Sequence, residues 1–362
     1  MMDVYSGGNQ QGYQQPQNQP PYYQTVQVQP NRRPLSFWIA IVLGIFLFLS
    51  FIFNVLLLSA VVSTATVRNT HNMQEDFIAG DAGSQNKIVV IDISGVIMNE
   101  EAGGLLFSST DMVTKVSTEL SYAEEDNSVK AVILRVNSPG GAITACDTIY
   151  DQIKRFRKKR PDVKVIAFYE TVSASGGYYV TAGADKIIAS PTCITGSIGV
   201  IMSFYNLEEL YQKIGLKDVV IKSGEFKDIG SPSRPMTDKE NELFREMLNE
   251  MYQRFLTVVD EGRKIMDMAK VKELADGRVF TGEQAKLNGL VDETGYFEDA
   301  VETAEKTAGI SGAKVVKYGK IPSFIDVLFG ASGRQEQFDM ATELHKLFLA
   351  KTPVMMYLYR IE

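Results

Sequence analysis

Residues 163–180 read VKVIAFYETVSASGGYYV, a strand-like run that passes through small residues into a helix-like run. The first part, VKVIAFY (163–169), is short and rich in apolar and β-branched residues, which is typical of a buried strand. A helix is predicted directly after it, at 175–183. A strand that leads at once into a helix is a building block of α/β domains with parallel sheets.

The same alternation of strand and helix is found on both sides of this stretch. Buried strands are predicted at KIVVIDISGVI (87–97), AVILRV (131–136) and KIIAS (186–190), and a helix at 142–159. The repetition predicts an α/β domain with a largely parallel sheet, which we place at residues 87–310.

A long helix is predicted beyond the sheet, at about 237–264, after the turn-like SPSRPM. Thr237 is followed three residues later by Glu240, which predicts a capping box at the start of this helix. The C-terminal extension, 311–362, is amphipathic and carries the apolar PVMMYLYR close to its end.

The N-terminal part predicts a tail and a membrane anchor. Residues 1–34 are rich in Gln, Pro, Asn, Tyr and Gly, a composition that buries too little apolar surface to fold, so we expect a disordered tail. FWIAIVLGIFLFLSFIFNVLLLSAVV (37–62) exceeds the roughly 20 apolar residues that cross a bilayer. We therefore predict one transmembrane helix at 36–63. A cleaved signal peptide is disfavoured, because its apolar region is usually only about 7–15 residues long.

Charges around this span predict its orientation. Arg32 and Arg33 precede it closely, whereas Arg68 alone follows within the next several residues. The positive-inside rule places the N-terminus in the cytoplasm and the remainder outside the cell membrane, in contact with lipid only through the anchor. Residues 64–86 are interpreted as a juxtamembrane linker.

The overall composition argues against two classes of site. The formal net charge is −7 with no basic cluster, so nucleic acid is not an expected partner. Cys146 and Cys193 match no metal or redox spacing. We favour two free buried thiols over a disulfide, and we expect no metal site.

Two loops that follow predicted strands are candidates for chemistry, because ligands of open α/β sheets bind at the carboxyl ends of the strands. The loop NSPGG, 137–141, follows AVILRV and offers backbone N–H groups to a phosphate or to a tetrahedral oxyanion. Ser175 lies in the turn SASGG, where a serine before two glycines can be a nucleophile elbow. A helix-capping role for Ser175 is the alternative.

A serine nucleophile also needs a base. His71 and His345 lie in the linker and near the C-terminus, so a Ser-His-Asp triad has poor candidates. Lysine can serve as the base when it is desolvated, because desolvation lowers its pKa. KSGEFKDIGSPSRP (222–235) contains Lys222 and Lys227, and composition alone does not distinguish either of them from a solvated surface charge.

Several linked motifs resemble the SppA peptidases (signal peptide peptidase, protease IV) in their short, single-domain bacterial form. The resemblance covers about 88–300. The motifs, in chain order, are LRVNSPGG (134–141), SASGGYYV (173–180), ADKIIASPTCITGSIGVI (184–201), IKSGEFKD (221–228) and ADGRVFTGEQAKLNGLVDETG (275–295). SASGG departs from the commoner AASGG of the family.

The resemblance implies a ClpP/crotonase-like spiral of βα units and a membrane-anchored serine endopeptidase without cofactor. By motif, Ser175 would be the nucleophile and Lys227 its base, and Ser197 would orient the lysine. The N–H groups of Gly141 and Gly176 would form the oxyanion hole. Substrates would be cleaved signal peptides and other unfolded peptides outside the membrane.

The resemblance also implies a partner, a further copy of the same chain. In double-length relatives the lysine and the serine lie in different halves of one chain. A single-domain chain would then pair Lys227 of one subunit with Ser175 of its neighbour in a ring-like homo-oligomer, octameric as in similar short forms. The apolar tail 353–362 is a candidate occupant of the substrate groove, in its own subunit or in a neighbouring one.

Three other functions remain as alternatives. A crotonase-like acyl-CoA enzyme would share the fold but is disfavoured by the membrane anchor and external placement. A catalytically inert membrane scaffold would be expected to lack Ser175 or Lys227. A phosphate-binding receptor domain based on NSPGG would have Arg135 as the only nearby cation in that motif.

Overall fold

The computed structural model describes residues 34–68, 73–99, 103–104, 107–108, 111–320 and 356–359. It divides into two compact units, Met1–His71 and Asn72–Glu362. The predicted tail lies outside the described residues apart from its last residue, and so does most of the C-terminal extension.

The described part of the first unit is one helix, α1 (Leu35–Arg68). Its segment Leu35–Leu58, 24 residues, is long and apolar enough to cross a membrane, and none of it is buried against protein. At 1.5 Å per residue this segment is roughly 36 Å long, which exceeds the hydrocarbon core of a bilayer. A helix that is apolar all round is suited to lipid.

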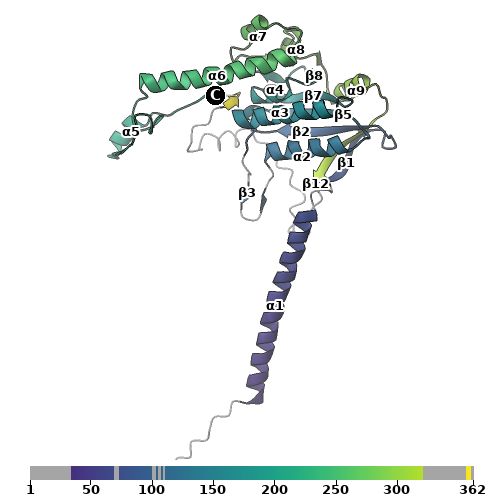
Figure 1. Ribbon diagram of the computed structural model, residues 1–362, viewed down its shortest axis with the longest axis vertical. Helices are drawn as coiled ribbons and strands as arrows, with labels where there is room; N and C mark the ends of the chain where they lie inside the picture. Colours follow the sequence, from purple (N-terminus) through teal and green to yellow (C-terminus); the bar gives the residue numbers. More distant parts are fainter. Residues whose placement is uncertain are drawn as a thin grey trace, which may run out of the picture. The chain divides into compact units, whose positions relative to one another are not determined.

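The second unit is built on a mixed sheet (Figure 1). Its central strands pair in parallel, as predicted, and carry near-continuous runs of buried Val, Ile, Leu and Ala. Two antiparallel pairings, of β1 with β12 and of β10 with β9, make the sheet mixed. The strands of the sheet lie in the order β1-β12-β2-β5-β7-β8-β11, and β9 pairs with β7. Their bounds are β1 (Met73–Gly80), β12 (Lys314–Lys320), β2 (Lys87–Ser94), β5 (Val129–Ser138), β7 (Lys164–Ala174), β8 (Lys186–Ala189), β11 (Glu293–Thr294), β9 (Ile194–Gly196) and β10 (Val279–Thr281).

Two boundaries differ from the sequence interpretation. The predicted linker 64–86 is not all linker, because α1 continues to Arg68 and β1 occupies Met73–Gly80. The domain also extends past residue 310, because β12 lies between β1 and β2. β1 is an edge strand, and β12 pairs with two strands that are far away in sequence, so local composition marks both of them weakly.

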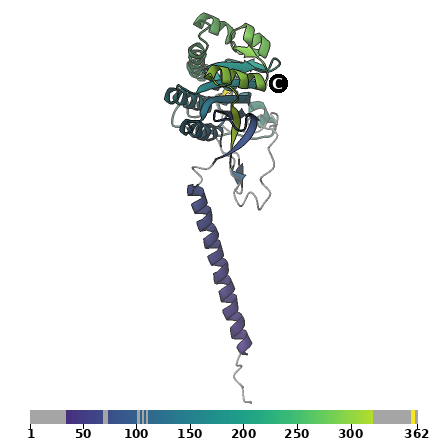
Figure 2. The same ribbon diagram turned by 90° about the vertical axis from the view of Figure 1, so that its right-hand side faces the viewer.

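Helices cover both faces of the sheet (Figure 2). One core joins alternate residues of the central strands to α2, α3, α4 and α6, and the other core joins the remaining residues to α9. The helices are α2 (Met112–Glu125), α3 (Ile143–Lys159), α4 (Gly176–Thr181), α5 (Glu208–Lys213), α6 (Asp238–Gly262), α7 (Met268–Leu274), α8 (Gly282–Leu287) and α9 (Phe297–Ala308). Two further short pairs are β3 (Gly103–Gly104) with β4 (Phe107–Ser108), and β6 (Gly140–Ala142) with β13 (Met356–Leu358).

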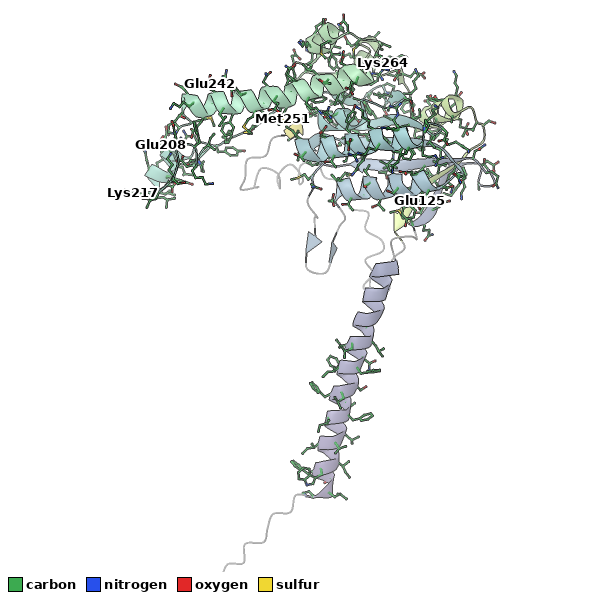
Figure 3. All side chains as sticks on the ribbon, in the orientation of Figure 1. Glu125, Glu208, Lys217, Glu242, Met251 and Lys264 are labelled. Atoms are coloured by element: carbon green, nitrogen blue, oxygen red, sulfur yellow. The ribbon has the colours of Figure 1, made fainter. Side chains whose placement is uncertain are left out.

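Helix α6 is the predicted long helix, and its capping box is confirmed: Thr237 Oγ1 accepts from Glu240 N at 3.3 Å, and Glu240 Oε2 accepts from Thr237 N at 2.8 Å. Its C-terminal half is buried through Phe255, Leu256, Val258 and Val259. Its N-terminal half projects beyond the sheet and carries α5 at its far end (Figures 1 and 3). We call residues 201–240 with this half of α6 the arm.

Candidate active site

Ser175 lies in a strained turn between β7 and α4. Its φ is 53° and its ψ is −114°, and Ser175 and Ser197 are the two non-glycine residues with positive φ in the described chain. Such a conformation costs of the order of 1–3 kcal/mol and persists only when surrounding contacts enforce it. Two backbone hydrogen bonds do so: Ser175 N–H donates to Gly196 O at 2.8 Å, and Tyr179 N–H donates to Ser175 O at 2.9 Å.

The Ser175 hydroxyl is not used as a helix cap. No side-chain capping bond is formed at the start of α4, and Ser175 Oγ has no hydrogen-bond partner among the described residues although the residue is only 1% exposed. A buried hydroxyl without a partner is costly in a purely structural role. The geometry therefore favours the nucleophile elbow over the capping alternative.

The loop after β5 lies directly beside this turn. A Cβ on Gly176 would lie 2.5 Å from Cys146 Sγ and 3.0 Å from Gly141 N. A Cβ on Gly141 would lie 1.9 Å from Ile97 O, so both positions require glycine. The structure thus brings Gly141 and Gly176 together next to Ser175, as expected for two donors of one oxyanion hole.

Ser138 holds this loop and was missed in the sequence analysis as a site residue. Its Oγ accepts from Gly140 N at 3.1 Å and donates to Gly95 O at 2.6 Å, and the residue is fully buried. The N–H of Gly140 is therefore already satisfied, and the N atom of the next residue, Gly141, lies 3.0 Å from the position of a Cβ on Gly176. The available signal was a small hydroxyl residue directly before Pro-Gly-Gly.

The end of the chain adds a strand to the same loop. β13 pairs antiparallel with β6, with Tyr357 opposite Gly141, and Tyr359 N–H donates to Pro139 O at 2.7 Å. Hydrogen-bonded pairs alternate in an antiparallel ladder, so Tyr357 and Gly141 are a pair of the hydrogen-bonding kind. The tail thus lies as an added antiparallel strand on the loop that contains Gly141.

A groove of about 620 Å³ adjoins the tail. Ser197, with φ of 47°, lies in its wall, and its N–H donates to Arg278 O at 2.8 Å. Further wall residues come from the segment after Ser197, from α6, from the turn before β10 and from the tail: Val200, Leu248, Tyr252, Asp276, Leu358 and Tyr359.

Lys227 is exposed and lies on the arm. Its loop is fastened to the start of α6, because Arg234 bonds both Asp228, at 3.0 Å, and Glu240, at 2.5 Å. The Arg234 guanidinium, followed by Lys222, holds the pKa of Asp228 well below its usual range. Lys222 is engaged with Asp228 at 2.7 Å, so of the two candidate lysines Lys227 is the one outside this network.

No hydrogen bond joins the Ser175 hydroxyl to Lys227 within the described part of one chain. Tyr179, one turn after Ser175, packs its ring 4.9 Å from that of Phe255 on α6. Glu240, which anchors the Lys227 loop through Arg234, lies 15 residues earlier on the same helix. At 1.5 Å per residue, Glu240 and Phe255 are roughly 22 Å apart along α6.

The remaining candidates were two histidines and two cysteines. His71 and His345 lie outside the described residues. Cys146 and Cys193 are free and buried, as predicted, and burial raises the pKa of the Cys193 thiol to about 12. Within the described ranges no group of His, Cys, Asp and Glu is suited to hold a metal ion.

Comparison with known proteins identifies the family. The sequence matches peptidase family S49 over residues 157–311 and Clp protease over residues 88–195. It is 40% identical over 238 residues to the Enterococcus faecium protein named "Putative signal peptide peptidase SppA". The aligned residues make up 66% of this chain and 68% of that relative. Protease 4 of Haemophilus influenzae is 37% identical over 227 residues, 61% of this chain and 35% of the relative.

A plant relative extends the comparison. The chloroplastic serine protease SPPA of Arabidopsis thaliana is 33% identical over 232 residues, 64% of this chain and 34% of the relative. The Clp protease match agrees with the α/β fold described above, and the S49 match includes the turn that carries Ser175. The chain belongs to peptidase family S49, the serine peptidases that include these SppA and Protease 4 relatives.

Proposed function

We propose that this chain is a membrane-anchored serine endopeptidase that uses Ser175 as nucleophile and Lys227 of a neighbouring subunit as base. The observation that carries the proposal is the strained turn at Ser175, which leaves a buried hydroxyl unpartnered beside the amides of Gly141 and Gly176. Strain kept at one residue by surrounding contacts is typical of functional sites.

The reaction follows from these groups. Ser175 Oγ attacks the peptide carbonyl carbon while its proton passes to Lys227 Nζ, and the carbonyl oxygen becomes an oxyanion bound by the N–H groups of Gly141 and Gly176. Collapse breaks the C–N bond, and Lys227 returns the proton to the leaving amine. Water then hydrolyses the acyl-enzyme by the same route, and Ser197 orients the lysine throughout.

A lysine must be neutral before it can accept a proton, and Lys227 is exposed within one chain. Burial in a subunit interface would desolvate the ammonium and lower its pKa. The arm that carries Lys227 exposes many large apolar side chains, which supports such an interface. They are Ile201, Tyr205, Leu210, Ile214, Leu216, Val219, Val220, Ile221 and Phe226, with Ile221 97% exposed.

The proposed assembly is therefore a homo-oligomeric ring, with eight subunits as the expected number. Each arm would bring Lys227 to the groove beside Ser197 and Ser175 of the next subunit. The Lys227 loop is fastened at Glu240, roughly 22 Å along α6 from Phe255, which packs against Tyr179, and this supports a site shared between subunits.

The proposed substrates are cleaved signal peptides and other unfolded peptides. An extended chain can pair with β6 as β13 does, so the site suits substrates without fixed structure of their own. Anchoring through α1, with the N-terminus in the cytoplasm and the catalytic unit outside, would place the enzyme where apolar signal-peptide remnants gather.

The test is hydrolysis of a fluorogenic signal-peptide-like substrate by the full-length chain in detergent, beside Ser175→Ala and Lys227→Ala. We expect the parent to cleave and each variant to be inactive. Co-expression of the two variants should restore part of the activity, since one variant supplies the lysine and the other the serine. Variants as active as the parent would refute the assignment, and a silent but assembled parent would favour the inert scaffold.

The tail supports a second part of the proposal, that residues 353–362 compete with substrate for the loop at β6. Deletion of these residues should raise basal peptidase activity, because β13 then no longer covers Gly141. Unchanged basal activity after the deletion would contradict this role.

A further inference from the structure

A polar contact joins the nucleophile helix to its two neighbouring helices. Tyr179 of α4 is fully buried, and its hydroxyl donates to Asp147 Oδ1 of α3 at 2.5 Å. Arg254 of α6 donates to the same oxygen, from Nη2 at 2.9 Å and from Nε at 3.2 Å. One carboxylate oxygen thus receives donors from both α4 and α6. We call Tyr179, Asp147 and Arg254 the Asp147 relay.

Tyr179 is also coupled to the reacting residue. Its backbone N–H donates to Ser175 O at 2.9 Å, so a shift of Tyr179 moves the strained turn. Its ring packs 4.9 Å from that of Phe255 on α6 and 5.6 Å from that of Tyr150 on α3. Helix α4 has only six residues, too few to set its own position, so its neighbours must do so.

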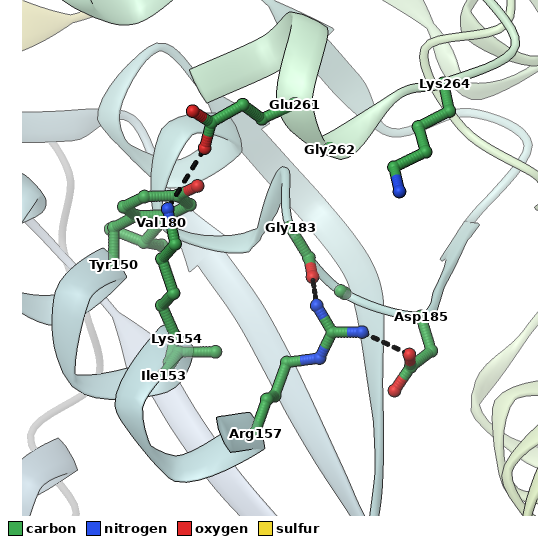
Figure 4. Close-up of a pocket in the computed structure, with 11 residues that line it drawn as sticks. Tyr150, Ile153, Lys154, Arg157, Val180, Gly183, Asp185, Glu261, Gly262 and Lys264 are labelled. Atoms are coloured by element: carbon green, nitrogen blue, oxygen red, sulfur yellow. Dashed lines mark hydrogen bonds and ion pairs between the residues drawn. The ribbon is translucent and has the colours of Figure 1, made fainter. Parts of the chain in front are cut away.

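Packing between α3 and α6 is incomplete near the relay. A pocket of about 290 Å³ lies between the ends of α3 and α6 and the segment after α4 (Figure 4). Lys154 of α3 reaches Glu261 of α6 at 3.1 Å, as Figure 4 shows. Both side chains are about half exposed, and an ion pair of that kind positions weakly. The bond from the buried Tyr179 to a charged acceptor is the more directional link.

The same helix, α6, holds the Lys227 loop at its other end through Glu240 and Arg234. In the proposed ring, one α6 would therefore pack against Tyr179, four residues after the serine of one active site, and hold the lysine loop of the next. The relay touches the serine end of this helix, roughly 22 Å from the lysine end.

We propose that the Asp147 relay positions Ser175, and that its loss impairs those active sites whose serine comes from the altered subunit. This inference rests on the proposed function, since it takes Ser175 as nucleophile. Tyr179 is a positioning residue here and does not touch the substrate. Loss of its hydroxyl should lower kcat on the order of tenfold and leave KM within about twofold, because small misplacements of a nucleophile mainly cost rate.

The test introduces Tyr179→Phe into full-length chains that already carry either Lys227→Ala or Ser175→Ala. Each double variant is co-expressed with the other dyad variant, which keeps Tyr179. Assemblies that contain both chains are purified through a different tag on each. In the Lys227→Ala background the altered subunit supplies the serine, and activity should fall. In the Ser175→Ala background it supplies the lysine, and activity should stay near that of the unmodified pair. A general folding or assembly defect would lower both, so equal losses in the two backgrounds overturn the inference, as does no loss in either.

Tyr178→Phe is the matched control. Tyr178 is the neighbouring fully buried tyrosine of α4, and its hydroxyl donates to Leu290 O at 2.8 Å, outside the relay. Its activity should be unchanged in both backgrounds. If the Ser175→Ala and Lys227→Ala chains with intact Tyr179 show no activity when combined, the proposal of a shared dyad is wrong. The relay is then tested by introducing Tyr179→Phe or Tyr178→Phe alone into the parent chain. Equal kcat values for these two variants would overturn the inference.

Discussion

Glu119 provides a quantitative prediction about stability and pH. It lies on α2, is 2% exposed, and its Oε2 has no hydrogen-bond partner among the described residues. Its other oxygen, Oε1, lies 4.0 Å from Lys115 Nζ, too far for a hydrogen bond. Burial raises the pKa of Glu119 from 4.5 to about 7. Burial also lowers the pKa of Lys115, so both partners are pushed toward their neutral forms.

The direction of the pH effect follows from the linkage between proton binding and the free energy of unfolding. The folded protein keeps the Glu119 proton at pH values where the unfolded chain has lost it, so the free energy of unfolding falls as pH rises from about 4.5 through about 7. At about 1.4 kcal/mol per pH unit, the gap between these two pKa values corresponds to roughly 3 kcal/mol. Most of this loss should occur between pH 5 and pH 8.

The perturbation is Glu119→Gln, which keeps the shape and removes the titration. Relative to the parent, the variant should gain roughly 2–3 kcal/mol of unfolding free energy between pH 5 and pH 8. The assay is urea unfolding of the full-length chain in detergent, followed by far-UV circular dichroism at several pH values. Glu124→Gln is the control, because Glu124 lies on the same helix and forms a solvent-facing pair with Lys159. Parallel pH curves for Glu119→Gln and the parent would refute the reasoning.

Three further predictions concern the site and the core. Gly176→Ala should lower kcat/KM at least 100-fold, because its Cβ would lie 2.5 Å from Cys146 Sγ and displace an oxyanion donor; peptide hydrolysis tests this, and near-parent activity would contradict it. Ser138→Ala should lower kcat about tenfold with little change in KM, since Gly140 N–H loses its acceptor; a rise in KM alone would point to substrate binding instead. Arg263→Ala should destabilise the fold by about 3–5 kcal/mol, because Arg263 is 4% exposed and pairs with Asp292 at 2.8 Å; thermal unfolding measures this, and a loss below about 1 kcal/mol would show that the pair contributes little.

Much of the central fold was predictable from local pattern. The strands predicted at 87–97, 131–136, 163–169 and 186–190 correspond to β2, β5, β7 and β8, and the helix predicted at 142–159 corresponds to α3. The four strands lie within the sheet, where burial requires apolar runs that are visible in the sequence. Helix α3 packs on the sheet through its buried face. Edge strands such as β1 have mixed composition and were placed in a linker.

Site residues were predictable where a motif coincides with a backbone requirement. Ser175, Gly141 and Gly176 lie in turns whose tight spacing admits few other residues, so the sequence itself marks them. Ser138 carries no such mark, because a buried serine that bonds two loops resembles any other serine. The pairing of β13 with β6 was equally hidden, since it joins segments more than 200 residues apart.

By itself, then, the sequence determined the long apolar helix α1, the central βα units and the identity of the turn residues, because each depends on composition or conformational preference within a short window. Tertiary structure alone decided that the Ser175 hydroxyl has no partner among the described residues and that the tail lies on the Gly141 loop. It also decided that the Lys227 loop is fastened to the start of α6, whereas Phe255 of the same helix packs against Tyr179. These are relations between distant segments. They depend on how the helices and strands pack, and above all on the direction in which α6 lies across the sheet, which no local pattern encodes.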